Sequence, residues 1–91
     1  MIRDVRLSVP DKVLAKLPKQ VLVKLHLWIT LVGEQGLDEV RRIPGFHDEP
    51  LSGQRVGQRS IRLNRSYRAF YRIKRGVVVF VDVFELNKHD Y

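Results

Sequence analysis

Hydrophobic and polar residues alternate at the start of the chain in a way that is typical of a strand. Within residues 2–9, Val5, Leu7 and Val9 fall on one side, and Pro10 follows them. A period of two puts successive side chains on opposite faces of an extended chain, and proline interrupts the hydrogen bonding of a strand. The pattern therefore predicts a short first strand that ends before Pro10.

The next segment is predicted to be helical, with a break near its start. Asp11 is suited to cap a short helix that runs to about Leu17, because its carboxylate can accept hydrogen bonds from the first free N–H groups. Pro18 can occupy the first turn of a second helix, where a missing N–H has no consequence. Gly33 and Gly36 provide the stop.

Residues 19–33 fit two patterns. One set of apolar residues follows the helical spacing i, i+4, i+7, i+11: Val21, Leu25, Trp28 and Val32. A second set alternates as in a strand: Val21, Val23, Leu25, Leu27, Ile29 and Leu31. About 14 residues without a turn signal would be long for a strand in so small a chain, so length favours the helix. A helix this apolar must be covered on most of its sides, by the sheet or by a bound partner.

Three further strands are predicted in the second half of the chain. A brief helical turn over residues 37–43 ends before Pro44, and residues 46–57 have the composition of a loop. The strand patterns that follow cover residues 59–64, 67–74 and 77–84. The predicted order is β-α-α-β-β-β in a single domain over residues 1–91. This is an α+β fold, with two helices packed on one face of a mainly antiparallel, twisted sheet.

The alternation in these strands assigns residues to the two faces of the sheet. The apolar set is expected to face the helices: Ile61, Leu63, Tyr67, Ala69, Tyr71 and Ile73. Because neighbours along a strand point to opposite faces, Arg62, Arg68 and Arg72 are expected on the other, open face. Three guanidinium groups would then line one surface, although strand arginines are also common simply because they are solvated.

The distribution of charge indicates the kind of partner. The 91 residues carry 17 Lys and Arg against 10 Asp and Glu, a formal charge of +7. Residues 51–81 hold eight basic side chains and no acidic one, whereas the rest of the chain holds nine basic and ten acidic. Such segregation favours RNA, DNA or an acidic protein as partner over a merely solubilising surface. The absence of cysteine excludes disulfides and thiolate chemistry, and no stretch approaches the roughly 18–20 apolar residues of a membrane span.

The candidate chemistry is proton transfer at a phosphate. The sequence has no phosphate-binding glycine loop, zinc-protease motif or serine-hydrolase elbow, and its carboxylates show no metal-ligand spacing, so no metal or cofactor is expected. Metal-free attack of an RNA 2′-hydroxyl on the adjacent phosphate needs a base, an acid and cations. His47, Glu49 and His89 can transfer protons, and Arg62 and Arg68 can stabilise charge. The proton-transfer candidates also have non-catalytic interpretations, as a solvated loop residue, a turn cap or part of an unspecialised tail.

Several motifs together resemble the RelE/ParE superfamily of bacterial toxins, and most of all its YoeB and HigB branches, which are ribosome-dependent mRNA interferases. The motifs are Glu49-Pro50-Leu51-Ser52-Gly53, Ser60-Ile61-Arg62, Arg68-Ala69-Phe70-Tyr71 and the ending His89-Asp90-Tyr91. About half of the chain carries the match. The resemblance implies a RelE-like fold of the microbial RNase type, with the active site on the open, concave face of the sheet.

The resemblance also implies roles for single residues. Glu49 matches the general base of the family, and Arg62 and Arg68 match its phosphate-binding arginines. His89 and Tyr91 are similar to the terminal pair that supplies the acid and positions the base.

The sequence departs from the YoeB pattern at two points. Ser52 stands where YoeB has a lysine, so this cationic contact is lost or is moved to Arg55 or Arg59. Asp90 is inserted before the final tyrosine; HigB toxins combine such an Asp-Tyr ending with an upstream histidine, so His47 is a further candidate, and the division between acid and base stays open. The remaining basic side chains of this region are expected to contact RNA or the ribosome: Arg55, Arg59, Arg65, Arg72, Lys74, Arg75 and Lys88.

The leading hypothesis is a type II toxin that cleaves mRNA in the ribosomal A site, in the bacterial cytoplasm and away from membranes. Its expected partners are the ribosome, the mRNA and a cognate antitoxin with acidic and apolar segments, which covers either the basic face or the helices. The alternative is a ParE-like inhibitor of DNA gyrase, which binds without catalysis and has no need of Glu49, His89 or Tyr91. A third hypothesis is a nucleic-acid-binding module in which charge alone matters.

Overall fold

Five strands form one mixed sheet in the order β1-β5-β4-β3-β2. The computed structural model describes residues 1–86, and its strands are β1 (Asp4–Leu7), β2 (Glu49–Pro50), β3 (Arg59–Arg62), β4 (Tyr67–Lys74) and β5 (Val77–Glu85). β1 runs parallel to β5, and all other neighbours are antiparallel. The four strands predicted from the sequence are therefore confirmed in a mainly antiparallel sheet. β2 is an addition, because it lies in the segment that the sequence predicts as a loop.

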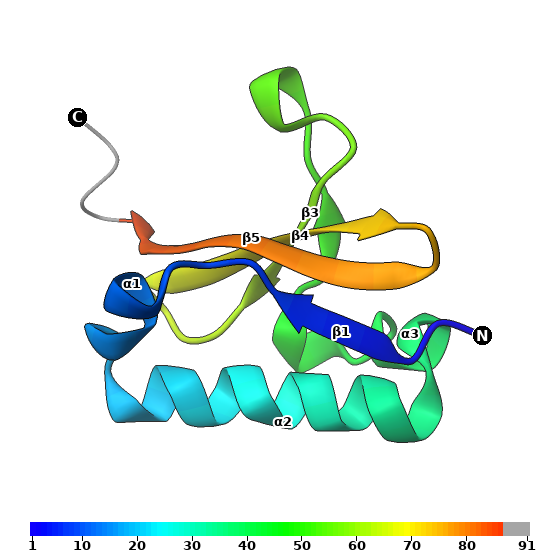
Figure 1. The fold of residues 1–91 in the computed structure, drawn as a ribbon, viewed down its shortest axis with the longest axis horizontal. Helices are drawn as coiled ribbons and strands as arrows, with labels where there is room; N and C mark the ends of the chain where they lie inside the picture. The colour runs from blue at the N-terminus through cyan, green and yellow to red at the C-terminus, as the bar shows by residue number, and fades with distance from the viewer. Residues whose placement is uncertain (87–91) are drawn as a thin grey trace.

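Along the chain the helices come between β1 and the other strands. In space they cover one face of the sheet. They are α1 (Asp11–Ala15), α2 (Lys19–Gln35) and α3 (Leu37–Val40), followed by two 3₁₀ turns, η1 (Pro44–Phe46) and η2 (Gly53–Arg55). Figure 1 shows α2 running along the sheet, while the loop that carries η2 (green) stands out on the side away from α2. We call this second side the open face. The helix predicted over the ambiguous residues 19–33 is confirmed, and it continues for two more residues.

The helix ends differ in detail from the sequence prediction. Pro10 and Pro18 are the residues at the two N-caps, and Asp11 is the first residue of α1 with no side-chain capping bond. Each proline combines its fixed φ near −56° with an extended ψ, which starts a helix without a carboxylate cap. Gly33 lies inside α2, and only Gly36, with φ +86°, ends it. At that φ a side chain would be strained, so a glycine is required there.

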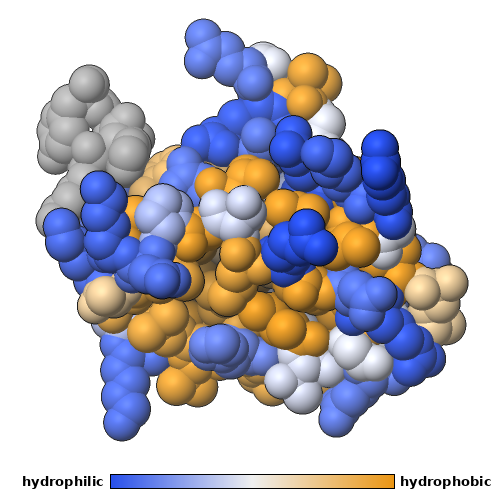
Figure 2. All heavy atoms as spheres, in the orientation of Figure 1, coloured by the Kyte–Doolittle hydropathy of each residue, from blue (hydrophilic) through white to orange (hydrophobic). Residues whose placement is uncertain are grey.

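The core forms between α2 and the helix-facing side of the sheet. Val21, Leu25, Trp28 and Val32, the stripe predicted from helical spacing, are all fully buried. The Trp28 ring lies 5.2 Å from the rings of both Tyr71 and Phe80, measured between centroids. Aromatic pairs at this separation add to the stabilisation from apolar burial alone. In Figure 2 hydrophobic residues gather between the sheet and α2, and hydrophilic ones surround the projecting loop.

A bulge in β5 sets which of its residues face the helices. Phe70 pairs with Asp82, but Tyr71 pairs with Phe80, so Val81 is left as the extra residue. The bulge lets both Phe80 and Val83 face the helices although they are three residues apart. Ala69 and Tyr71 are buried as predicted. Ile73 pairs with buried Val78, so it lies on the predicted side, but it is 42% exposed. Phe70 is on the open face yet only 5% exposed.

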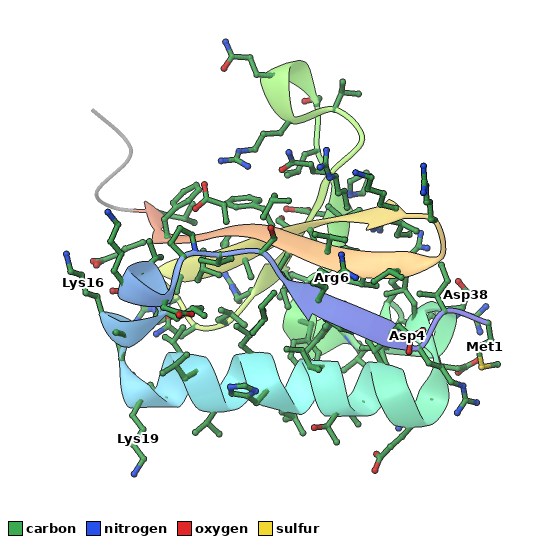
Figure 3. The ribbon with its side chains drawn as sticks, in the orientation of Figure 1. Met1, Asp4, Arg6, Lys16, Lys19 and Asp38 are labelled. Carbon is green, nitrogen blue, oxygen red and sulfur yellow. The ribbon has the colours of Figure 1, made fainter. Side chains whose placement is uncertain are left out.

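The outer side of α2 exposes an apolar strip. Val23 and Leu27 are 59% and 50% exposed, and they line a shallow groove of about 640 Å³ between lysines. One of these, Lys19, extends from the start of α2 away from the sheet (Figure 3). The sheet therefore covers only one side of this helix. Within residues 1–86 no helix has the length and apolarity needed to cross a membrane.

Two leucines of α2 provide a matched test of this packing. Replacing buried Leu25 by alanine removes core contacts and leaves a cavity, so we expect the free energy of unfolding to fall by about 2–5 kcal/mol. Leu27→Ala removes the same atoms from the exposed side, where we expect a loss below about 1 kcal/mol. Urea denaturation followed by circular dichroism measures both. Equal losses in the two variants would contradict the orientation of α2.

Candidate active site

Three neighbouring strands bring the candidate residues to one end of the open face. Arg62 on β3 is the direct partner of Arg68 on β4, and Glu49 on β2 is the direct partner of Ser60 on β3. Direct partners share a face, and their Cβ atoms lie about 4.5–5.5 Å apart. Two arginine side chains thus leave the sheet from neighbouring positions on the same face. Such an arrangement is unfavourable for the cations alone and suits an anion with several oxygens, such as a phosphate.

Arg68 is positioned by several acceptors. Its Nε and Nη2 donate to Oγ of Ser60 at 3.2 and 2.9 Å, and Nη2 also donates to the carbonyl oxygen of His47 at 3.1 Å. Nη2 lies 3.4 Å from Oε1 of Glu49. The Arg68 side chain is 14% exposed and the Glu49 side chain 61%. A guanidinium held by several acceptors therefore stands beside a carboxylate that solvent can reach.

A buried carboxylate fixes the segment that carries Glu49. The Asp48 side chain is fully buried, and its oxygens accept hydrogen bonds from Nε of Arg59 and from the hydroxyl of Tyr71, both at 2.6 Å. Arg59 and Tyr71 are direct partners on the helix-facing side of β3 and β4. Because Asp48 is held on that side, the next residue, Glu49, emerges on the open face. We call these three residues the Asp48 cluster.

Ionisation of the Asp48 cluster follows from its burial and its charges. Burial raises the pKa of Tyr71 far above its ordinary value, the hydrogen bond to Asp48 and the charge of Asp48 raise it further, and the charge of Arg59 opposes them. Burial lowers the pKa of Arg59, but the hydrogen bond and charge of Asp48 outweigh this and leave it raised. The phenol therefore stays protonated and the guanidinium stays charged over the whole range in which proteins are normally handled.

The other residues predicted to bind RNA are distributed over the molecule. Arg72 and Lys74 are exposed on the open face of β4, and Arg65 is exposed in the turn before it. Lys74 and Arg75, together with Arg6 of β1, line a cavity of about 450 Å³ on the open face (Figure 3 labels Arg6). The basic surface thus extends from the arginine pair along β4 to its far end.

Some of the predicted residues are not brought to the arginine pair. Arg59 belongs to the Asp48 cluster on the helix-facing side, so its guanidinium is committed to a buried partner. His47 is exposed and takes a left-handed backbone with φ +46°, and it reaches Arg68 through its carbonyl oxygen. Lys88, His89 and Tyr91 lie outside the described residues. Between Met1 and Leu86 no group of three or more histidine or acidic side chains could hold a metal ion.

Comparison with known proteins decides the fold. No known family profile matches the chain, and no curated protein sequence matches it. Solved structures do match. YafQ from E. coli superimposes with a TM-score of 0.73 at 20% identity, over 98% of this chain and 99% of YafQ. The chain has the RelE/ParE toxin fold. The resemblance seen in the sequence is therefore confirmed for the fold.

Two toxin complexes share this RelE/ParE fold. The RelBE2 toxin–antitoxin complex from Mycobacterium tuberculosis matches with a TM-score of 0.59 at 25% identity, over 90% of this chain and 95% of the matched chain. The YoeB–YefM complex from Staphylococcus aureus matches with a TM-score of 0.64 at 16% identity, over 88% and 92%. Identities this low leave the residue assignments to the geometry of the site itself.

Two residues of the candidate site were given no role in the sequence prediction. Ser60 had a usable signal, because it alternates with Arg62 and so shares its face. Asp48 had none, because its partners are 11 and 23 residues away and meet it only after β2, β3 and β4 have paired. A single acidic residue between His47 and Glu49 is not distinguishable from a solvated loop residue.

Replacing Asp48 by asparagine tests the buried cluster. The change leaves Arg59 without its countercharge, so we expect the free energy of unfolding to fall by roughly 2–4 kcal/mol, somewhat less than for a fully buried pair because Arg59 is partly exposed. Asp38→Asn is the control, since its ion pair with Arg41 spans 3.8 Å and its side chain is 86% exposed. That variant should match the wild type. An equally stable Asp48→Asn protein would rule out the cluster.

The raised pKa of Tyr71 predicts an alkaline pH dependence. Above pH 10, the ordinary pKa of tyrosine, the phenol ionises in the unfolded chain but stays protonated in the native one. The native state then binds more protons, so the free energy of unfolding falls as pH rises, by up to about 1.4 kcal/mol per pH unit. In Tyr71→Phe this contribution is absent, so the free energy of unfolding should fall less steeply with pH between about pH 10 and 11.5. Identical slopes in urea titrations of the two proteins would refute the assignment.

Proposed function

We propose that this protein is the toxin of a type II toxin–antitoxin system, an endoribonuclease that cleaves mRNA in the A site of the ribosome. The observation that carries the proposal is the direct pairing of Arg62 with Arg68 beside the exposed Glu49 carboxylate. The RelE/ParE fold and the toxin–antitoxin complexes among its structural neighbours support it.

The proposed reaction uses only side chains of the chain and the RNA itself. The Glu49 carboxylate takes the proton of a 2′-hydroxyl, whose oxygen attacks the adjacent phosphorus. The bond from phosphorus to the 5′-oxygen breaks, and His89 donates a proton to that leaving oxygen. The products are a 2′,3′-cyclic phosphate and a 5′-hydroxyl. Arg62 and Arg68 stabilise the additional negative charge on the phosphate oxygens during the attack.

Two further residues belong to the proposed catalytic set. Tyr91 is assigned from the sequence resemblance to positioning the general base. His47 is exposed and lies two residues before Glu49, so it is the second candidate for the acid. A ribosome that holds the message against this face would contribute much of the rate through orientation.

The partners follow from charge and exposed apolar surface. The basic side chains of residues 51–81 fit ribosomal RNA and mRNA, with Arg65, Arg72, Lys74, Arg75 and Lys88 as proposed contacts. An antitoxin with acidic and apolar segments would neutralise this surface or cover the groove on α2. The proposed place of action is the bacterial cytoplasm, where the ribosomes are.

Single replacements of Arg68 and His89 test the proposed catalysis. Removing one cation that faces the developing charge is expected to lower the cleavage rate about 10²–10³-fold, and removing the acid about 10²–10⁴-fold. Arg68→Ala and His89→Ala should therefore abolish growth arrest on controlled expression and the cuts that primer extension detects in a translated reporter message. Arg42→Ala, which removes an exposed arginine paired with Glu39, is the control and should stay toxic. Circular dichroism checks that each variant is folded.

The same experiment separates the alternatives. Full toxicity of both variants would remove the catalytic assignment. Induction of the DNA-damage response without cleavage of mRNA would favour a ParE-like gyrase inhibitor. Equal cleavage of translated and untranslated message would contradict the dependence on the ribosome.

A further inference from the structure

Arg55 lies over a pair of phenylalanine rings on the open face. The central carbon of its guanidinium is 4.4 Å from the centroid of the Phe70 ring and 5.6 Å from that of the Phe84 ring. The two rings are 4.7 Å apart and tilted by 32°. This contact accounts for the burial of Phe70, which is only 5% exposed although it points away from the core. The alternating pattern of β4 gave no reason to expect a contact between Arg55 and these rings.

The edges of the same guanidinium are also held. Nη2 donates to Oδ2 of Asp82 and Nη1 to Oε1 of Gln58, both at 2.9 Å. Rings beneath the group and acceptors at its edges fix its position, yet the Arg55 side chain remains 35% exposed. The group is therefore ordered before any ligand binds.

These contacts, like those of Arg68 with Glu49 and Ser60, occupy part of the hydrogen-bonding capacity of the Arg55 guanidinium. Its charge is already paired with Asp82, and a phosphate near the guanidinium would also meet the Asp82 carboxylate, which is 40% exposed. The N–H groups that point to Asp82 and Gln58 are engaged. Besides its remaining N–H groups, the guanidinium offers a planar, delocalised surface, on which the bases of single-stranded RNA commonly stack.

The Arg55 guanidinium and its two phenylalanine rings lie next to the candidate phosphate site. Phe70 follows Arg68 by two residues on β4 and shares its face, a separation of about 7 Å along a strand. Phe84 is the direct partner of Arg68. This spacing is comparable to the distance between neighbouring nucleotides in an extended strand. The η2 loop that carries Arg55 stands out from the open face, as Figure 1 shows.

We propose that the Arg55 guanidinium, held by Phe70, Phe84, Asp82 and Gln58, is a stacking platform for one nucleobase of the RNA substrate, adjacent to the scissile phosphate. The proposal rests on the proposed ribonuclease function and adds a base contact to it. The competing explanation is that Arg55 only fastens the η2 loop to the sheet. The two differ in one respect: only a stacking platform makes the penalty for a missing base at one position of the message depend on Arg55.

The test combines a variant of Arg55 with removal of single bases. Arg55→Lys keeps the charge but loses the planar group. Ribosomes are programmed with messages that carry an abasic residue at each position around the cut in turn, and single-turnover cleavage is measured with the wild type and the variant. Arg42→Lys, at an exposed arginine that pairs with Glu39 and has no proposed role in binding, is the matched comparison. Thermal unfolding checks that the variants are folded.

A stacking platform predicts coupling at one position. The wild type should lose about 5- to 150-fold in rate when one particular base is absent, which is the range of base stacking. Arg55→Lys should be slower by a similar factor on the intact message and insensitive to the loss of that base. Arg42→Lys should keep the full sensitivity of the wild type.

Three results would overturn the inference. Arg55→Lys with the same abasic penalties as the wild type would assign Arg55 to fastening the loop. A wild type without a penalty at any position would mean that no base is stacked. In both cases cleavage itself persists, so the ribonuclease function stands. Failure of the wild type to cleave any ribosome-bound message would instead reject the proposed function, and the platform with it.

Discussion

The buried Asp48 carboxylate is the contact on which the geometry of the open face depends. It joins Arg59 and Tyr71 on the helix-facing side, and Tyr71 in turn packs against Trp28 of α2. A carboxylate without exposed surface is tolerated only when its charge is paired and its oxygens are hydrogen-bonded, and both conditions are met here. The two-residue strand β2 is too short to hold its own position by pairing alone. The Asp48 cluster therefore ties it to the core.

The residues on either side of Asp48 meet the same arginine. The carbonyl oxygen of His47 accepts from Arg68, and the Glu49 carboxylate lies 3.4 Å from it. One buried contact thus fixes both an acceptor that orients Arg68 and the carboxylate proposed as general base. The open face places like charges next to one another, with Arg62 opposite Arg68. Like charges placed side by side lower the stability of the native state. Interactions elsewhere compensate for this loss, here the apolar packing beneath the sheet.

Local sequence pattern predicted the strands, the main helix and the faces of several residues. Alternation with a period of two was enough to put Arg62 and Arg68 on one face, and the stripe from Val21 to Val32 identified the buried side of α2. What could not be predicted depends on contacts between distant segments. β1 pairs with β5 across most of the chain, and the bulge at Val81 becomes visible only from the register with β4. Arg55 reaches Asp82 over 27 residues, so its stacking on Phe70 left no trace in the local pattern.

A double-mutant cycle between Asp48→Asn and Glu49→Gln measures the dependence of the site on its buried anchor. The quantity is the single-turnover rate of cleavage of ribosome-bound mRNA, with the wild type, both single variants and the double variant folded at the temperature used. If Asp48 positions Glu49, Glu49→Gln lowers the rate by about 10²–10⁴-fold in the wild type and by little once Asp48 has been replaced. An equal loss in both backgrounds would mean that Asp48 supports stability alone and that Glu49 is positioned without it.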